Sequence, residues 1–540
     1  MAQNAVFGIN SNLDTQDIIN KMVSLEARSM DLIEAKKQIE QQKLSSFQEL
    51  KNRLQTFKSV VTTLNTESRF IVNKSSFSNS SSSDSNKVVD ITTTSSATSG
   101  TYSLIVNNLA TETKIISEGF PTTTSEVTMS SLVVTVGGVA KTINVDSSNN
   151  TVDGLRLAIN NLGLDVKASF LNDGDDTNPI RLLISGNLTG ASGAVTVVNP
   201  VSGIGTGALS GIDFKTKQYA QNASFTIDGV AVSKSSNTVS DVISGAALKL
   251  QSAGSGTISL STDTDAITSK VSDFVDEYNE ISLFLREQLA LDPESEETGV
   301  LFGNFAVQNL QQILRSSISS EVTGISGDYK YLSQIGITTE SDGSLVLDTD
   351  DLSEALIDDI QNVSQLFSSK GTVTHSSVAY VGFTSDTEPG YYDLKVANGV
   401  PQLSNSGAAT FVNASGSGNF WAGSSGDATG LNFRISNLSN GDYGQVWLSI
   451  GVAEILNRQL ENMVDSSLNG PLVTEVDTIT ETVDDFNITL LNQAERLLEF
   501  EESLKAKFSN LEIVLGRLNA QRDTFNSSLA GIQNIFSQKK

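Results

Sequence analysis

The sequence predicts an α+β multidomain protein in which long helices at the two ends of the chain form a coiled-coil and helical-bundle stalk with inserted antiparallel β-domains. Glycine and proline are absent from Asp14 to about Asn65, and proline is absent after Pro471. Between these ends, short alternating apolar segments and glycine-rich turns dominate. Because apolar residues repeat every three to four positions in helices and every two in strands, helical ends and a strand-rich middle follow.

The composition excludes several classes of function. The 540 residues include 35 Lys and Arg, 62 Asp and Glu, one His and no Cys, which gives a net charge of −27. Without Cys there is no disulfide, thiolate metal site or Cys nucleophile. The acidic charge opposes binding to nucleic acid. The chain has no apolar run of about 18 residues, so no membrane insertion is expected. Its first residues match no ordinary secretory signal, which leaves a cytoplasmic protein or export without a cleaved signal.

The first long helix is expected to begin at Asp14 or Thr15, both suitable N-caps, with Asp17 favourable in the first turn. Its second half carries an apolar seam with spacings of three and four, which must pack against another helix: Phe47, Leu50, Leu54, Phe57, Val61 and Leu64. Charged residues interrupt the same register further toward the N-terminus, and apolar residues then return: Lys43, Glu40, Lys36, then Ile33, Met22 and Ile19. The first 40 residues are therefore expected to be held less firmly.

The C-terminal helix carries the longer seam. Counting three and four alternately from Val476, thirteen of the next seventeen positions are apolar, among them Leu490, Leu497, Phe500, Leu504, Leu511, Leu518, Phe525 and Ile532. About 60 helical residues span on the order of 90 Å, more than a small globular core covers. The N-terminal helix is the natural coiled-coil partner. Both seams extend past any core that a bundle supplies, so their outer residues are candidate contacts for another subunit or partner: Ile19, Met22, Leu511, Leu518, Phe525 and Ile532.

A third seam predicts another helix, which ends before Pro293: Ile267, Val271, Phe274, Tyr278, Ile281 and Leu285. Shorter helical patterns cover Phe305–Ile318 and Leu352–Phe367. These helices can complete a bundle with the inner halves of the terminal helices.

The middle of the chain predicts β-modules. Ser75–Ser85 is a low-complexity linker. Hairpins are expected at Leu132–Val136 followed by Gly137-Gly138, at Phe225–Ile227 followed by Asp228-Gly229, and around Asp342-Gly343. Each of the first two leads to a short helix signal, at Leu155–Asn161 and Val239–Leu248. The pattern Gly100-Thr-Tyr-Ser-Leu-Ile-Val106 is echoed by Gly390-Tyr-Tyr-Asp-Leu-Lys-Val396, within a second β-like stretch at Thr372–Trp447.

Candidate catalytic or ligand-binding motifs are weak. His375 is expected in a strand or at its edge and has no nucleophile elbow nearby, which favours a surface or structural role. Asp173–Asn178 resembles the start of a calcium loop but lacks the later Gly and Glu, so a solvated turn is expected. Gly203–Ala208 echoes a dinucleotide fingerprint without a βαβ unit around it. No cofactor, metal site or enzyme activity is expected.

Four pieces of the sequence, in order and spacing, resemble the flagellar filament cap protein family, also called hook-associated protein 2. The first is Gly8-Ile9-Asn-Ser-Asn-Leu13-Asp14, which has Asn10 and Asn12 where the family has Gly. The others are Gly100–Phe120, the bundle segment Leu332–Phe367 and the last helix Lys507–Gly531. Residues 144–185 also resemble the repeat module of flagellins and hook-associated proteins, whereas Thr372–Trp447 falls outside the resemblance and looks like an additional domain.

The resemblance implies a structural protein, secreted by the flagellar type III export apparatus with an export chaperone. It implies a ring of about five or six copies at the filament tip, where the cap retains exported flagellin and promotes its folding and insertion. Two alternatives stay open: an adhesin at the tip that binds host glycans or mucin, and another axial protein such as a junction protein or filament subunit.

The expected domain division follows from the seams and the resemblance. Residues 1–42 and 505–540 form terminal coiled-coil legs, and 43–68, 262–370 and 451–504 form a helical bundle. Residues 69–120 and 219–261 form a first β-domain, with a second, 121–218, inserted in it. Residues 371–450 form an additional inserted β-domain.

Overall fold

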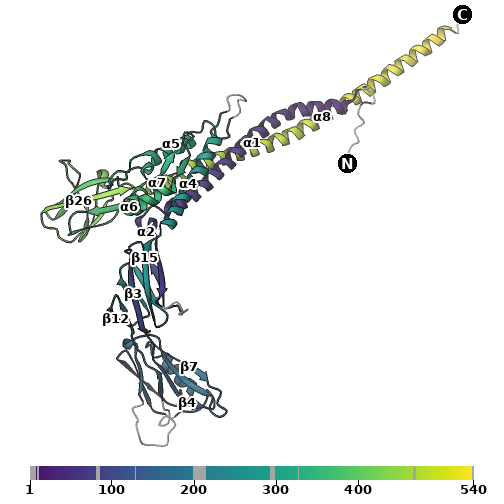
Figure 1. Ribbon diagram of the computed structural model, residues 1–540. Helices are drawn as coiled ribbons and strands as arrows, with labels where there is room; N and C mark the ends of the chain where they lie inside the picture. Colours follow the sequence, from purple (N-terminus) through teal and green to yellow (C-terminus); the bar gives the residue numbers. More distant parts are fainter. Residues whose placement is uncertain are drawn as a thin grey trace. The chain divides into compact units, whose positions relative to one another are not determined.

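The computed structural model describes residues 8, 11, 13–80, 86–127, 129–198, 214–291, 298–325, 327–465 and 470–537, with side chains up to residue 533. The chain divides into two compact units. One consists of residues 1–66 and 270–540, and the other of residues 67–269. Both ends of the chain are helical and the intervening chain is rich in strands (Figure 1), as the sequence predicts.

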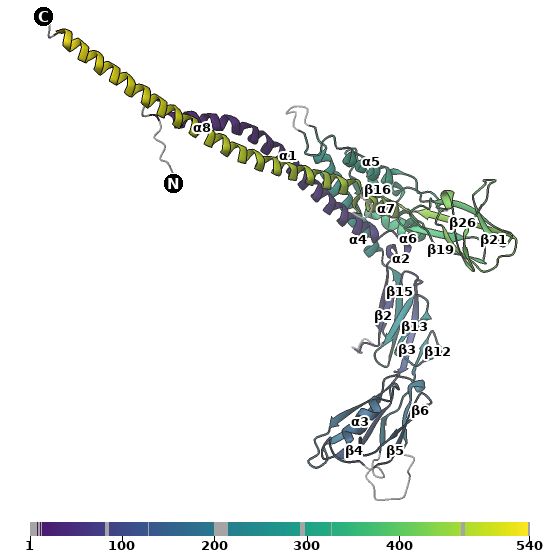
Figure 2. The same cartoon turned by 180° about the vertical axis from the view of Figure 1, so that it is seen from behind.

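Two long helices form the rod of the first unit. Helices α1 (Thr15–Thr62) and α8 (Pro471–Ser537) lie side by side in both ribbon views (Figures 1 and 2). They run antiparallel, because Ser29 contacts Gln493 whereas Ser11, just before α1, contacts Glu512. The predicted pairing of the two ends is thus confirmed. Asp14 caps α1 by accepting a hydrogen bond from the Asp17 N–H at 3.0 Å. Helix α8 is 67 residues long and α1 is 48, so α8 continues past the start of α1.

Shorter helices surround the inner ends of α1 and α8 and complete the predicted bundle. They are α4 (Thr264–Gln288), α5 (Phe305–Ser319), α6 (Thr349–Phe367) and α7 (Val452–Val464). Aromatic rings join three of the helices: Phe57 lies 5.6 Å from Phe274 and 6.4 Å from Tyr278, and Phe274 lies 5.9 Å from Phe367, between ring centroids. Since aromatic side chains bury large apolar areas, this cluster is a main source of bundle stability.

A small hairpin packs on α4 and confirms the turn expected at Asp342-Gly343. It follows η3 (Leu332–Ile335) and pairs β16 (Ile337–Thr339) with β17 (Leu345–Leu347). The Asn279 side chain of α4 bonds both the N–H and the carbonyl of Leu345, at 2.7 and 2.9 Å. The pKa of the Asp342 carboxyl lies well below its usual value, mainly because Ser344 donates hydrogen bonds to it and, to a lesser extent, because Arg286 does so.

A β-domain is inserted between α6 and α7. One sheet has the strand order β18-β26-β20-β21-β22 and the other β19-β25-β24-β23. Their bounds are β18 (Ser369–Val373), β19 (Val378–Gly382), β20 (Gly390–Ala397), β21 (Val400–Asn405), β22 (Val412–Asn413), β23 (Ser415–Ser417), β24 (Phe420–Ala422), β25 (Asn432–Ile435) and β26 (Gly441–Ile450), with η4 at Gly426–Ala428. Burial raises the pKa of Tyr392, whose hydroxyl donates to the Glu388 and Asp427 carbonyls between the sheets.

The second unit begins with α2 (Glu67–Phe70) and contains two β-domains. The first has sheets of order β1-β15-β3-β11-β12 and β13-β14-β2. Its strands are β1 (Asn73–Asn79), β2 (Val89–Thr93), β3 (Gly100–Asn108), β11 (Ala223–Ile227), β12 (Val230–Lys234), β13 (Thr238–Ile243), β14 (Ala246–Leu250) and β15 (Gly254–Thr262). The helix expected at Val239–Leu248 is wrong: Leu248 of β14 pairs with Val239 on one side and with Ile91 of β2 on the other. Pairing with a distant strand overrides the local pattern.

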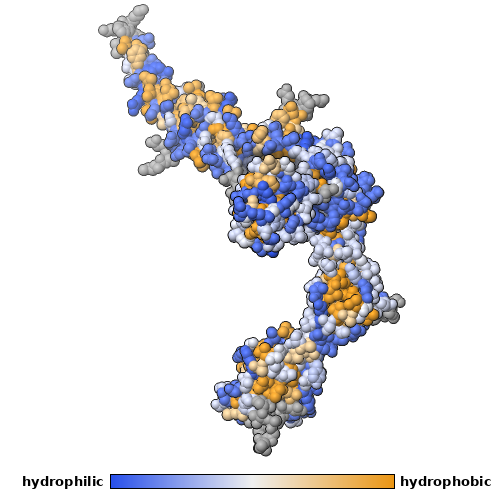
Figure 3. Space-filling view, turned by 90° about the vertical axis from the view of Figure 1, so that its left-hand side faces the viewer, coloured by the Kyte–Doolittle hydropathy of each residue, from blue (hydrophilic) through white to orange (hydrophobic). Residues whose placement is uncertain are grey.

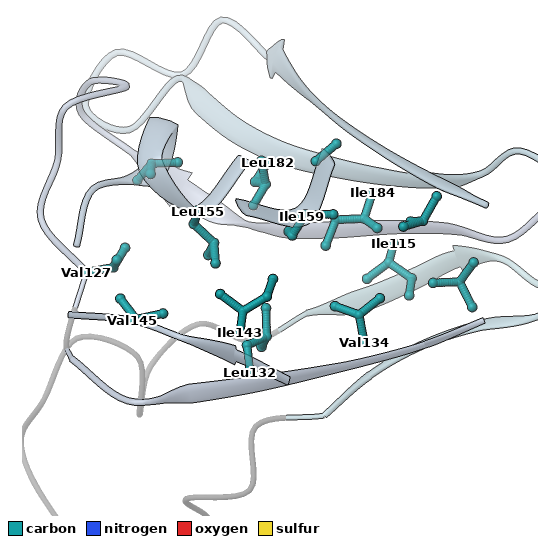
Figure 4. Close-up of a cluster of buried hydrophobic side chains, with 14 of the residues drawn as sticks. Ile115, Val127, Leu132, Val134, Ile143, Val145, Leu155, Ile159, Leu182 and Ile184 are labelled. Atoms are coloured by element: carbon teal, nitrogen blue, oxygen red, sulfur yellow. The ribbon is translucent and has the colours of Figure 1, made fainter. Parts of the chain in front are cut away.

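The other β-domain of this unit lies between β3 and β11 in sequence. Its sheets have the orders β10-β4-β8-β7 and β6-β5-β9. Its elements are β4 (Lys114–Phe120), β5 (Ser131–Val136), β6 (Val139–Asn144), α3 (Val152–Asn160), β7 (Val166–Asn172), β8 (Ile180–Gly186), η1 (Ala191–Gly193), β9 (Val195–Val198) and β10 (Lys215–Gln218). Figure 4 shows Leu155 and Ile159 of α3 filling the space toward Leu132 and Ile143 of the predicted hairpin. The helix expected at Leu155–Asn161 is therefore present and is part of the core.

The five-stranded sheet of the inserted β-domain 369–450 resembles that of the first β-domain of the second unit in part of its strand order. Both five-stranded sheets place the first and last strands side by side, followed by a strand beginning with Gly-x-Tyr. The tight hairpin differs in position, because it joins β11 to β12 in one sheet and β20 to β21 in the other. The register also matches, because Gly100 pairs with Leu260 and Gly390 with Leu448. The sequence echo between β3 and β20 therefore marks strands that hold the same position in the two sheets.

Candidate assembly surfaces

The inner seam of α1 is fully covered. We use this name for Phe47, Leu50, Leu54, Phe57, Val61 and Leu64, all at most 1% exposed. Helices α4, α7 and α8 all pack against this part of α1. Arg53 extends the same contact at its edge, donating to Glu49 at 2.8 Å and to Glu280 of α4 at 3.0 Å. The inner seam is therefore an internal core rather than a surface for a partner.

Beyond the bundle, α1 and α8 pair in an outer coil, by which we mean residues 15–44 of α1 with 483–512 of α8. Of the C-terminal seam residues, Leu504 is buried, whereas Leu490, Leu497 and Phe500 are only half-buried. A gap of about 120 Å³ lies between the helices beside Ser29, Met30, Gln493 and Leu497. Polar contacts such as Ser29 Oγ to Gln493 Oε1, at 3.0 Å, replace apolar packing there. A single partner helix covers less of each seam residue than a bundle does.

The facing register of α1 shifts in the outer coil. Ile19 is buried, but Met22 is exposed and the half-buried Val23 takes the place that the uninterrupted register gives to Met22. Lys37 and Glu40, half-buried, occupy facing positions in the interrupted stretch. Long charged side chains cover apolar surface with their stems while the charged ends reach water, so they can occupy a seam with one partner. Met22 is thereby left on the outer surface.

The N-terminal motif lies beside α8. Gly8 has φ of +81°, a conformation that favours glycine. Leu13 is exposed, Asp14 is the helix cap, and Ile9 lies outside the described residues. The Ser11 hydroxyl donates to Glu512, a carboxylate that is buried against this segment. The motif thus ends the outer coil at the level of Glu512.

The free end of α8, residues 513–537, continues beyond this point (Figures 1 and 2). Leu511, Leu518, Phe525 and Ile532, at seven-residue intervals along and just before it, are between 41% and 64% exposed. A seven-residue apolar period on one helix is the pattern of a coiled-coil seam without its partner. The structure therefore places these predicted contact residues on an uncovered stripe.

A polar cluster that the sequence did not indicate connects the bundle to the inserted β-domain. Glu454 of α7, nearly buried, accepts from Asn65 at 2.8 Å and from Arg458 at 3.1 Å. Arg458 also donates to the carbonyls of Ser385 and Thr387 and lies over the Phe383 ring. Glu454 and Arg458 are spaced four apart on an amphipathic helix, a pattern indistinguishable in sequence from a surface ion pair.

The structure describes two of the three remaining sequence candidates. His375 lies in the turn after β18 rather than in a strand, accepts from the Ser377 N–H at 3.1 Å and packs against Tyr443. Asp175 accepts backbone bonds from Thr177 and Asn178, as in the solvated turn expected there. Gly203–Ala208 lies outside the described residues.

The described part of the chain holds no group of three or more acidic or His side chains suited to a metal ion. No helix of this part combines the length and the apolar character needed to cross a bilayer.

A covered helical bundle, a two-helix rod and three β-domains define a multidomain α+β protein whose two terminal helices pair. Residues 220–520 match the family described as flagellar hook-associated protein 2 C-terminus, and residues 11–113 match flagellar hook-associated protein 2 N-terminus. Flagellar hook-associated protein 2 of Escherichia coli K12 is 30% identical over 396 residues, 69% of this chain and 82% of its own length. B-type flagellar hook-associated protein 2 of Pseudomonas aeruginosa is 29% identical over 67% of this chain and 79% of its own.

A solved structure shares the fold. The crystal structure of the flagellar cap protein FliD D1-D2-D3 domains from Escherichia coli matches with a TM-score of 0.55 and 24% identity, over 81% of this chain and 99% of that one. The chain belongs to the flagellar hook-associated protein 2 family. It is a structural, extracellular component of the bacterial flagellum and caps the tip of the filament.

Proposed function

We propose that copies of this chain form a ring that closes the filament tip, retains exported flagellin and promotes its insertion. The main support for the proposal is the free end of α8, where apolar side chains at seven-residue intervals are exposed. Such a helix end is suited to pack against helices of other axial subunits. A ring of about five or six copies on a helical filament meets non-equivalent neighbours, which a loosely held rod can accommodate.

In the proposed division of labour, residues 1–42 and 505–540 are legs that contact the filament. The bundle of residues 43–68, 262–370 and 451–504 connects them to the β-domains, which form a plate: 69–120 with 219–261, 121–218, and the additional 371–450. The exposed apolar contacts in the legs are the candidates Met22, Leu511, Leu518, Phe525 and Ile532. Delivery by the type III export apparatus with a chaperone belongs to the same proposal, as does the absence of catalysis.

The test is complementation of a strain that lacks this protein. The full chain should restore swimming and keep flagellin out of the medium, whereas a chain truncated before Ser528 should fold but release unpolymerised flagellin. Far-UV circular dichroism of the purified truncation checks the fold. Normal swimming by the truncated chain would count against the legs as the working part. No feature of the described residues favours the adhesin or the other axial role, so neither is proposed.

A further inference from the structure

Each helix of the outer coil carries a second apolar stripe that its partner does not cover. On α1 it consists of Leu25, Leu32 and Ile39, at seven-residue intervals, and on α8 of Ile488, Leu491 and Leu498. These six side chains are between 52% and 71% exposed. Figure 3 shows hydrophobic residues in orange on the outer surface of the rod. The stripes differ from the seam that joins α1 to α8, because the seam residues next to them are half-buried or buried.

The two stripes lie at the same level of the rod. Since Ser29 of α1 contacts Gln493 of the antiparallel α8, three residues further along α1 correspond to three residues back along α8. Counted from this contact, Leu32 is level with Leu490 and Leu25 with Leu497. Counted from the contact between Ser11 and Glu512, Leu32 is level with Leu491 and Leu25 with Leu498, so the two stripes share a level to within one residue. The α1 stripe spans residues 25–39 and the α8 stripe residues 488–498, so Ile39 lies beyond the end of the α8 stripe.

The two stripes face opposite flanks of the coil. In heptad terms Val23 and Met30 occupy position a of α1, which places Leu25 and Leu32 at c, next to g. Leu490 and Leu497 occupy position a of α8, which places Leu491 and Leu498 at b, next to e. In an antiparallel pair one flank carries the g positions of both helices and the other flank carries the e positions. A single rod therefore cannot bring its two stripes together.

The charges beside the stripes are complementary. Positions c, f and g of α1 between residues 21 and 43 carry four basic side chains and no acidic one: Lys21, Arg28, Lys36 and Lys43. Positions b, e and f of α8 between residues 481 and 502 carry acidic side chains and no basic one: Glu481, Asp484, Glu495, Glu501 and Glu502. By level, to within one residue, Arg28 corresponds to Glu495 and Lys21 to Glu502. Lys21 bonds Asp17 at 2.7 Å within α1, but its side chain stays 74% exposed.

We propose that the α1 stripe of one copy packs against the α8 stripe of the next copy, so that the outer coils of neighbouring subunits lie parallel in a ring. Two different patches at one level on opposite flanks make a head-to-tail interface, which closes into a ring when the rotation permits. The apolar residues pair as Leu25 with Leu498 and Leu32 with Leu491, flanked by Arg28 with Glu495. The inference rests on the proposed function only for the side-by-side arrangement of copies, and it adds the contact that joins their legs.

The absence of Cys from the native chain makes a disulfide test direct. Full-length chains carrying Leu32→Cys or Leu491→Cys, one of them with a size tag, are mixed, oxidised mildly and run on a non-reducing gel. The expected product is the mixed dimer, with little dimer from either variant alone. The matched control mixes Asp31→Cys with Asn492→Cys, exposed positions at the same level on the other two sides of the helices, and should give no mixed dimer.

A charge reversal separates attraction from mere proximity. Adding Arg28→Glu to the Leu32→Cys chain should lower the yield of mixed dimer about threefold to tenfold, and Glu495→Arg on the partner chain should restore it. Equal cross-linking of the control pair, predominance of dimers of one variant, or no mixed dimer in protein that light scattering shows to be oligomeric would overturn the inference. Because complementation measures flagellin release separately, a functional cap without this cross-link would refute the leg contact and leave the proposed function standing.

Discussion

The inner and outer halves of α1 have the same secondary structure but different environments. From Phe47 to Val61 the seam is buried by several helices, whereas from Thr15 to Leu44 the helix pairs with α8 alone and only Thr15 and Ile19 are fully buried. The comparison shows that the apolar periodicity determines which face of a helix is covered. The number of partner helices determines how completely the side chains on that face are buried. Stability should therefore fall along the helix toward its N-terminus.

The largest expected contrast is in amide hydrogen exchange of the isolated chain. Amides of residues 47–61 should exchange only when the bundle unfolds. Amides of residues 513–533, which have no partner helix, should exchange at least about 100-fold faster, with residues 20–40 in between. Mass spectrometry of peptides from both segments measures the difference. Uniform protection along α1 and α8 would remove the distinction between the two halves.

The next largest effect is expected from Phe57→Ala. Its ring packs on Phe274 and Tyr278 in the bundle, so truncation leaves a cavity and should lower the free energy of unfolding by about 3–5 kcal/mol. Urea denaturation followed by circular dichroism measures the change. Gln55→Ala, at an exposed position of the same helix, should change stability by less than about 0.5 kcal/mol.

A smaller loss is expected from Leu497→Ala in the outer coil. This side chain is half-buried and borders the gap between the helices, so truncation should cost about 1–2 kcal/mol rather than the full value of a core leucine. Leu498→Ala is the matched control, since its side chain faces outward and should leave the stability of the separate chain nearly unchanged. A loss for Leu497→Ala as large as for Phe57→Ala would show that the outer coil is packed like the bundle.

The smallest effect should have the opposite sign. Gln493→Leu replaces a polar seam residue beside the gap, at the cost of one exposed hydrogen bond to Ser29. The apolar gain should exceed that loss and stabilise the outer coil by about 0.5–1 kcal/mol. The thermal melting of helical signal should shift upward. A downward shift would mean that the gap holds the helices in a geometry that a larger apolar side chain disturbs.

Sequence periodicity was sufficient for the helices but not for their detailed register. The spacing of Phe47, Leu54 and Val61 is regular and the structure buries all three. Where Lys36–Lys43 interrupt the pattern, continuing the register brought Met22 to the seam, but Val23 faces α8 instead. Charged residues with long stems leave the facing side undetermined from sequence, and the contact geometry with α8 decides it.

The β-modules show a different limit. The hairpin turn at Asp228-Gly229 was predictable because its residues tolerate positive φ, and both have it. The stretch Val239–Leu248 has an apolar spacing compatible with a helix, yet it forms parts of the two paired strands β13 and β14, and β14 also pairs with β2, more than a hundred residues earlier. The Glu454–Arg458 cluster was missed for the same reason: its other members come from distant segments, and local sequence does not contain that information.

The inserted β-domain enters and leaves the bundle through one pair of neighbouring strands. Ser369 of β18 pairs with Ile450 of β26, directly after α6 and directly before α7. Paired residues in an antiparallel sheet are about 5 Å apart, so the two attachment points can be bridged by a short turn. A different domain whose ends lie equally close together could therefore be inserted at this position without altering α6 and α7. Evolution can replace this domain while the helical bundle and the rod are kept. The same position suits the engineered display of an enzyme or an epitope on swimming cells.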